Sequence, residues 1–137
     1  MRIVASRLAR HVGRRGAFLL FLALLDGVVA YSLTQPLPLN LAPRVVYGPM
    51  MDIAPITWWA GWWAATSALC LSAAAWRRAH IAAFGAGGLI KAAWAACYLT
   101  GWVEHLPLYT RGYQTAAIYV AFAGVVLLVA GWRENGS

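Results

Sequence analysis

Four long apolar stretches constrain the fold more than any other feature of this sequence. They cover residues 16–33, 56–76, 81–102 and 113–132. A helix needs about 17–25 apolar residues to cross the hydrocarbon core of a bilayer, so each stretch is long enough to span a membrane. The other residues suffice only for the connections between the stretches. The sequence therefore predicts one all-α domain over residues 1–137, folded as a four-helix transmembrane bundle.

Composition supports a membrane protein, and the arginines predict its orientation. Charged residues make up 11% of the chain, against about 25% in a typical soluble domain. Only Arg44 and Arg111 lie in the first and last connections. The other arginines share the opposite side, and they are Arg2, Arg7, Arg10, Arg14, Arg15, Arg77, Arg78 and Arg133. Cytoplasmic loops are enriched in arginine and lysine, so both termini and the short middle turn are expected in the cytoplasm. The net charge of +7 then needs no nucleic acid to explain it.

The first residues, 2–15, form a basic segment that is amphipathic when drawn as a helix. Arg7, Arg10 and Arg14 follow a spacing of three and four residues, which places them on one helical face. A thin apolar face is formed by Val4, Leu8 and Val12. Such a helix can lie on a bilayer surface with its arginines at anionic lipid headgroups. The alternative is that these arginines only set the orientation of the first span.

Tryptophans occur where the predicted spans meet the headgroup region. The set comprises Trp58, Trp59, Trp62, Trp63, Trp76, Trp102 and Trp132. Tryptophan and tyrosine are enriched at membrane–water interfaces, so these residues are predicted to be interface anchors. The four tryptophans that open the second stretch also permit another interpretation, in which they form a cage around a ligand.

Two ionisable residues interrupt the apolar stretches, Asp26 in the first and Lys91 in the third. Counted from Arg15 and Arg78, they lie at depths of roughly 16 and 20 Å at a rise of 1.5 Å per residue. Charges inside a membrane are costly and mark candidate functional sites. The first and third spans run in the same direction, so we expect Asp26 and Lys91 to form an intramembrane pair. Its role is either structural or connected with conduction, proton movement or self-association.

Small residues recur at four-residue intervals in the two middle stretches. The rows are Ala60, Ala64, Ala68 and Ser72 in the second stretch, and Gly88, Ala92 and Ala96 in the third. Rows of this kind let two helices approach closely in a membrane. They predict helix-packing surfaces, either between helices of one chain or between copies in a homo-oligomer.

The sequence offers no pattern typical of an enzyme. Cys70 and Cys97 form no CxxC motif, and their expected depths differ by about 13 Å, which is too far for a disulfide within one chain. His11, His80 and His105 are scattered over different segments. We therefore expect no catalytic residue, no metal site and no cofactor.

The whole chain resembles the small four-span membrane proteins of actinobacterial phages. The resemblance is carried by the opening Ala9–Leu33, ARHVGRRGAFLLFLALLDGVVAYSL, by the tryptophan-rich second stretch and by Lys91 in the third. It implies a phage-encoded protein of the host inner membrane, of the holin-like kind.

Three functions are therefore in contention. The first is a holin-like protein that self-associates and permeabilises the membrane. The second is a membrane-embedded accessory protein, for example a superinfection-exclusion or partner-binding factor. The third is a small transporter that uses Asp26 and Lys91.

Overall fold

The computed structural model describes residues 2–36, 43–104 and 112–131, with side chains for 13–36, 47–104 and 113–131. Over this part of the chain the structure is helical and contains no strand. The elements are α1 (Arg2–Thr34), α2 (Pro43–Met51), α3 (Ile56–Ala75), the short 3-10 helix η1 (Arg77–Ala79), α4 (His80–Glu104) and α5 (Gly112–Gly131). The prediction of an all-helical fold is confirmed. Trp132 and the side chains of Arg7 and Arg10 lie outside the described residues.

Three segments of the described chain are long and apolar enough to cross a membrane. They are Gly13–Thr34, Arg77–Glu104 and Tyr113–Gly131. The stretch at 56–76 also forms a helix, α3, which has 20 residues but is less apolar than the other three. Its four tryptophans, together with its threonines and serines, lower its mean hydropathy. The fold thus contains three candidate membrane-spanning helices and a fourth helix of similar length.

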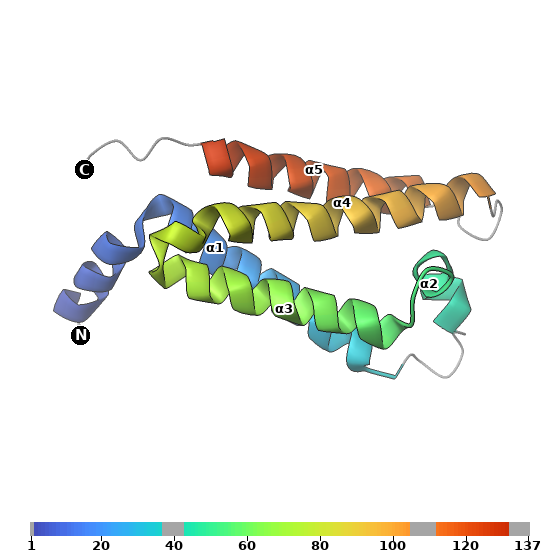
Figure 1. Ribbon diagram of the computed structural model, residues 1–137, viewed down its shortest axis with the longest axis horizontal. Helices are drawn as coiled ribbons and strands as arrows, with labels where there is room; N and C mark the ends of the chain where they lie inside the picture. The colour runs from blue at the N-terminus through green and yellow to red at the C-terminus, as the bar shows by residue number, and fades with distance from the viewer. Residues whose placement is uncertain (1, 37–42, 105–111, 132–137) are drawn as a thin grey trace.

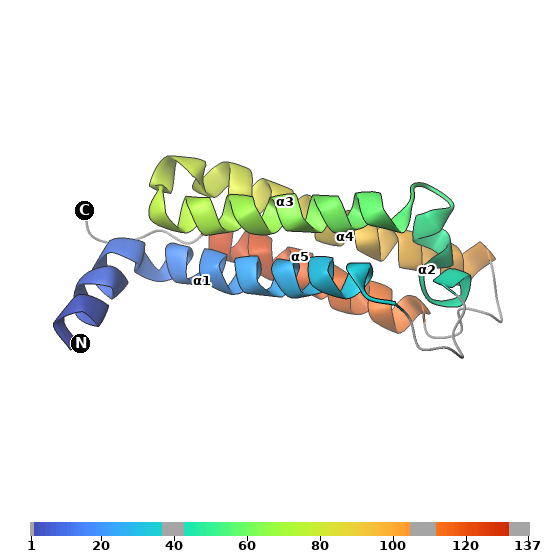
Figure 2. The ribbon, with the colours of Figure 1, turned by 90° about the horizontal axis from the view of Figure 1, so that it is seen from below.

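The four long helices are arranged as two pairs. α1 packs along α3, and α4 packs along α5, with much less extensive contact between one pair and the other. Figures 1 and 2 show these elements running nearly parallel to a common long axis. The two pairs are linked through η1, the tight turn between α3 and α4.

α3 and α4 diverge from this turn, and residue size explains the divergence. Near η1 the buried residues of the two helices are mostly small, and they include Cys70, Ala73, Ala74 and Ala83. At the far end the buried positions hold Trp59, Trp63 and Trp94. Bulky rings hold helices farther apart than methyl groups do, so the two helices form a wedge. α2 lies at the open end of this wedge (Figure 1).

The interior is divided into two apolar clusters. The cluster nearer η1 contains Leu19, Leu22, Ala23, Cys70, Ala73, Ala74, Ala83, Phe84, Val126 and Val129. The cluster nearer α2 contains Ala30, Leu33, Met50, Trp59, Ala60, Trp63, Ile90, Trp94 and Cys97. Along α1 the first cluster ends at Ala23 and the second begins at Ala30, with Asp26 between them. The charged residue therefore lies where the two clusters meet.

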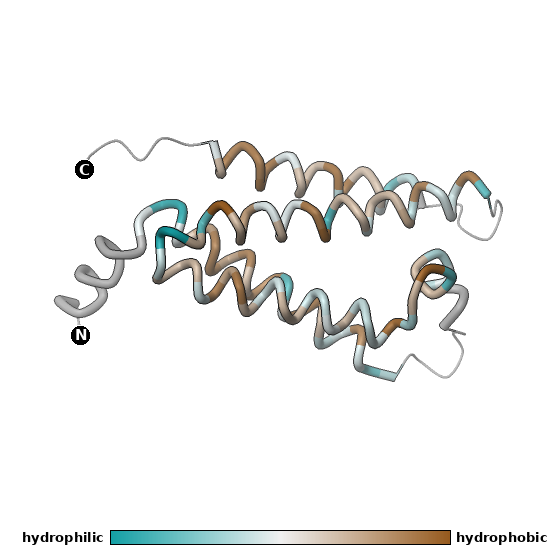
Figure 3. Tube along the Cα trace, in the orientation of Figure 1, coloured by the Kyte–Doolittle hydropathy of each residue, from teal (hydrophilic) through white to brown (hydrophobic). Residues whose placement is uncertain are grey.

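Much of the outer surface is apolar. Large exposed hydrophobic side chains run along α5 and include Ile118, Val120, Val125, Leu127 and Leu128. Figure 3 shows hydrophobic colour along most of α5, and hydrophilic colour at the bend in α1 and at the η1 turn. A monomeric soluble protein rarely exposes so continuous an apolar surface, whereas lipid tails cover one without cost.

A glycine sets the bend in α1. Gly13 has φ 63° and ψ 179°, a backbone conformation that is essentially restricted to glycine. The helical turns before Gly13 are therefore directed away from the axis of the remaining α1 (Figures 1 and 2). The predicted basic segment at 2–15 is helical up to this bend, and the bend separates it from the long apolar helix.

Candidate functional site, a buried charge pair

The predicted meeting of Asp26 and Lys91 is confirmed by the geometry. Lys91 Nζ donates a hydrogen bond to Asp26 Oδ1 at 2.6 Å, and the two side chains are 1% and 0% exposed. Asp26 comes from α1 and Lys91 from α4, so the interaction joins the two helix pairs. Both charged side chains are thus almost completely withdrawn from solvent.

The ring of Trp63 forms a third component of this site. Lys91 Nζ lies 5.1 Å from the centroid of the Trp63 ring, within the range of a cation–π interaction. The face of an indole ring carries partial negative charge, so it stabilises an ammonium group that has lost its water. A carboxylate and an aromatic face together hold the Lys91 charge in an apolar interior.

The hydrogen bonding of the site is incomplete among the residues that the structure describes. Asp26 Oδ2 and Trp63 Nε1 are both buried and have no hydrogen-bond partner there. A buried carboxylate is stabilised in proportion to the donors it receives, and a buried charge pair gains little over apolar packing unless these are satisfied. Lys91 is therefore the donor that stabilises the Asp26 carboxylate among the described residues, and it reaches only one of the two carboxylate oxygens, Oδ1.

Aromatic residues surround this pair on the side of α2. The ring of Trp63 meets that of Trp94 edge-on, with centroids 5.6 Å apart, and lies 6.2 Å from Tyr119 of α5. The ring of Trp59 also contacts that of Trp94, with their centroids 5.4 Å apart. Edge-to-face arrangements are the favourable geometry for aromatic rings. Side chains of three helices thus interlock next to Lys91.

The prediction that all these tryptophans are interface anchors is wrong for Trp59 and Trp63. Both are buried in the cluster nearer α2, whereas Trp58 and Trp62 on the neighbouring helical face are exposed. The four-residue spacing indicates two rows on one helix, but it does not tell which row faces inward. Trp76 is exposed and Trp102 is half-buried against Tyr113, so both remain candidates for anchors.

The small-residue rows are divided in a similar way. Ala60 is buried, and Gly88 lies against Val126 of α5. The remaining members are exposed, and they are Ala64, Ala68, Ser72, Ala92 and Ala96. Of the two predicted uses, packing within one chain therefore applies to Ala60 and Gly88, and the exposed members are left for contact between copies. The close contacts between helices are made elsewhere, for example by Gly27, where an added Cβ would lie 3.2 Å from Ser67 Oγ.

Sequence reasoning missed two polar contacts between helices. Ser67 Oγ donates to the carbonyl oxygen of Ala23 at 2.6 Å and joins α3 to α1. Arg15 Nη2 donates to the carbonyl oxygen of Ala130 at 2.5 Å and joins the start of the apolar part of α1 to the end of α5. An arginine near the last carbonyls of a helix is a common cap, but its partner helix cannot be read from the sequence.

The two cysteines are free and buried, and they belong to different clusters. Within the described ranges no group of three histidine, cysteine or acidic residues is placed to hold a metal ion. The comparisons with known proteins add no further assignment: no family model, no curated protein and no solved structure matches the chain.

Removal of one member of the pair should destabilise the protein more than removal of both. Lys91→Met leaves the Asp26 carboxylate buried without a partner, and we expect a loss of about 3–5 kcal/mol in the free energy of unfolding. The double variant Asp26→Val/Lys91→Met should recover most of this loss, because apolar side chains of similar volume replace a buried pair at little cost. Denaturant titration in mixed micelles measures the free energy of unfolding of the native protein and of the two variants. A double variant as unstable as Lys91→Met would contradict the account.

A buried and an exposed tryptophan of α3 should lose very different amounts of stability on substitution by alanine. Trp63→Ala removes a ring that is 0% exposed, and we expect a loss of about 3–5 kcal/mol. Trp58→Ala removes a ring that is 53% exposed, and we expect a change within about 0.5 kcal/mol. The same titration compares the two variants, and equal losses would mean that the inward and outward rows have been assigned wrongly.

Proposed function

We propose that this chain is a four-span protein of the bacterial inner membrane with both termini in the cytoplasm. The length of α3 supports the fourth span, because 20 residues cover about 30 Å at helical rise, the thickness of a hydrocarbon core. α3 also runs along α1, which is itself long and apolar enough to cross a membrane. The bend after Arg10 and the turn at Arg77 and Arg78 lie at the same end of the molecule (Figure 1), as cytoplasmic arginines would.

This orientation predicts the behaviour of reporters fused after Ser137. A reporter that is active only in the cytoplasm should be active there, and one that is active only in the periplasm should be silent. Fusions after Asp52, in the connection between α2 and α3, should give the opposite result and serve as the control. A periplasmic signal after Ser137 would reject the orientation.

For the biological role, we propose a holin-like protein that self-associates and permeabilises the membrane, without enzymatic activity. The observation that carries this proposal is the exposure of small residues on α3 and α4, at Ala64, Ala68, Ser72, Ala92 and Ala96. No part of the described chain covers these residues. By contrast, the exposed face of α5 consists of large side chains such as Leu127 and Leu128. Small residues favour helix–helix contact in membranes, so the exposed row of α3 and the exposed row of α4 are each suited to contact with a second copy.

The charge pair fits this role because it lets a single copy remain inert. Asp26 and Lys91 neutralise each other inside the chain, so a dilute copy presents no charge to lipid. Association through α3 and α4 brings further copies close to the helices that carry Lys91 and Trp63. Rearrangement of the two helix pairs within such an assembly would expose the charges to water and let ions pass. A protein encoded by a phage would then open the membrane only at high density.

Expression should reveal this activity directly. Induced expression in a bacterial host should collapse the membrane potential abruptly, measured with a potential-sensitive dye, and let a separately expressed endolysin reach the cell wall. Ala64→Leu and Ala92→Leu should delay or abolish the collapse, because they put bulk on the proposed contact face. Ala117→Leu, on the exposed face of α5, is the matched control and should behave like the native protein.

Failure of this experiment would favour the accessory protein. If dense expression leaves the membrane potential intact, the lytic role is excluded. The exposed face of α3 and α4 is then a binding surface for another membrane protein, as in superinfection exclusion.

A further inference from the structure

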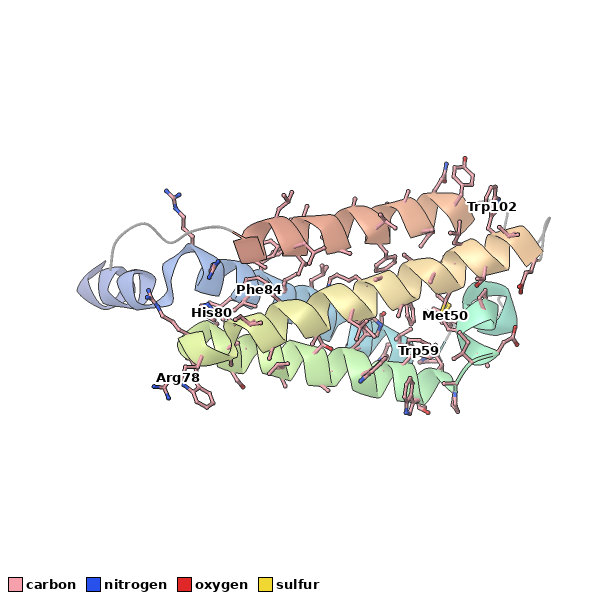
Figure 4. The ribbon with its side chains drawn as sticks, turned by 45° about the horizontal axis from the view of Figure 1, so that its top comes forward. Met50, Trp59, Arg78, His80, Phe84 and Trp102 are labelled. Carbon is pink, nitrogen blue, oxygen red and sulfur yellow. The ribbon has the colours of Figure 1, made fainter. Side chains whose placement is uncertain are left out.

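α2 contacts both sides of the wedge between the helix pairs (Figure 4). On the side of α3, Trp59 Nε1 donates a hydrogen bond to the carbonyl oxygen of Met50 at 3.0 Å. The side chain of Met50 is 0% exposed and belongs to the cluster nearer α2. The buried side chain of Met50, the partly buried ring of Tyr47 and one hydrogen bond therefore attach α2 to this side.

On the side of α4, α2 rests against a glycine. A Cβ added at Gly101 would lie 2.3 Å from Pro49 Cγ and 3.1 Å from Pro49 Cβ, too close for two carbon atoms. The pyrrolidine ring of Pro49 cannot rotate away as a flexible side chain could. α2 can therefore pack this closely on α4 only because residue 101 is glycine. Any side chain at this position would displace α2 from α4.

α2 is also a self-contained unit. Its backbone departs from helical geometry at Tyr47, and its end is closed by hydrogen bonds from Asp52 N to Gly48 O and from Ala54 N to Met50 O. Residues 52–55 connect it to α3, and Asp52 and Ile53 in this connection are exposed. A short helix at one end of a bundle is the kind of element that opens locally while the rest of the protein stays folded.

Beneath α2, aromatic rings lead to the charge pair. Met50 contacts Trp59, the ring of Trp59 lies 5.4 Å from that of Trp94, and Trp94 lies 5.6 Å from Trp63. Trp63 in turn lies 5.1 Å from Lys91 Nζ. This stack lies between the underside of α2 and the buried charges.

We propose that α2 is a hinged lid over the wedge between the two helix pairs. It swings about residues 52–55, lifts Met50 and Pro49 out of their places and admits water to the aromatic stack from that end of the molecule. In the closed position it keeps water from the Asp26–Lys91 pair. The lid is a property of the single chain and does not rest on self-association or on a lytic role.

The two native cysteines provide a test with an internal reference. Cys97 is 4% exposed and lies in the same cluster as Met50, whereas Cys70 is 0% exposed and lies in the cluster near η1. Cys70→Ala leaves Cys97 as the reporter under the lid, and Cys97→Ala leaves Cys70 as the reference. Each full-length variant is placed in lipid nanodiscs at one copy per disc. The rate of modification by a water-soluble methanethiosulfonate reagent is then measured.

Displacement of α2 should accelerate modification at one cysteine only. Gly101→Ala should raise the rate at Cys97 by about tenfold or more, because the rate follows the population of the open form, and it should leave the rate at Cys70 unchanged. Trp59→Phe removes the hydrogen bond to Met50 and should give a smaller rise at Cys97. Gly85→Ala is the matched control, because an added Cβ there meets nothing within 4 Å, and it should change neither rate.

Two results would overturn the lid. The first is an unchanged rate at Cys97 in both Gly101→Ala and Trp59→Phe, which would mean that α2 does not cover this side chain. The second is an equal rise at Cys70 and Cys97, which would mean that the substitutions loosen the whole protein. If Gly101→Ala does not fold, the comparison of Trp59→Phe with Gly85→Ala decides between the same outcomes.

Discussion

The ion pair between Asp26 and Lys91 ties together two halves that otherwise have limited contact. α1 with α3 and α4 with α5 each form a closely packed pair, and the 2.6 Å contact crosses between them at the junction of the two apolar clusters. A charge in this position strongly disfavours separation of the halves, because separation leaves two uncompensated charges in an apolar interior. Apolar contacts tolerate small sliding movements, whereas a salt bridge has a defined length and direction. The pair therefore sets the register of one half on the other.

A gradient of residue size along α3 and α4 accompanies this register. Small side chains near η1 keep the halves together, and tryptophans at the other end hold them apart. The open end of this wedge would leave apolar side chains uncovered, and α2 packs there against both α3 and α4. The charges lie between the tight end and the open end. Water is thus excluded by close packing on one side and by aromatic rings on the other.

Much of this architecture could be predicted from the sequence, because it depends on patterns that repeat along the chain. The lengths of the apolar stretches predict the four long helices, and the similar depths counted from flanking arginines predict that Asp26 meets Lys91. What could not be predicted depends on the rotation of each helix about its axis. Spacing places Trp59 and Trp63 in one row and Trp58 and Trp62 in another, but either row can face inward when the whole helix is apolar. The same ambiguity left open whether Ala64 and Ala92 face another helix of the chain or its outer surface, and they face the outer surface. In a soluble protein, polarity marks the outward face, and here it does not.

The hydrogen bond from Arg15 to the carbonyl oxygen of Ala130 has a consequence for biogenesis. Its partners are 115 residues apart, so it forms only after nearly the entire chain has left the ribosome. α1 and α5 have few other contacts, which makes this bond a fastening between the first and the last of the long helices. A nascent chain that ends before α5 can complete the α1–α3 pair and the salt bridge, yet its first helix keeps a guanidinium group without its acceptor. Docking of α5 against α1 is therefore the step that gives the Arg15 guanidinium group this acceptor.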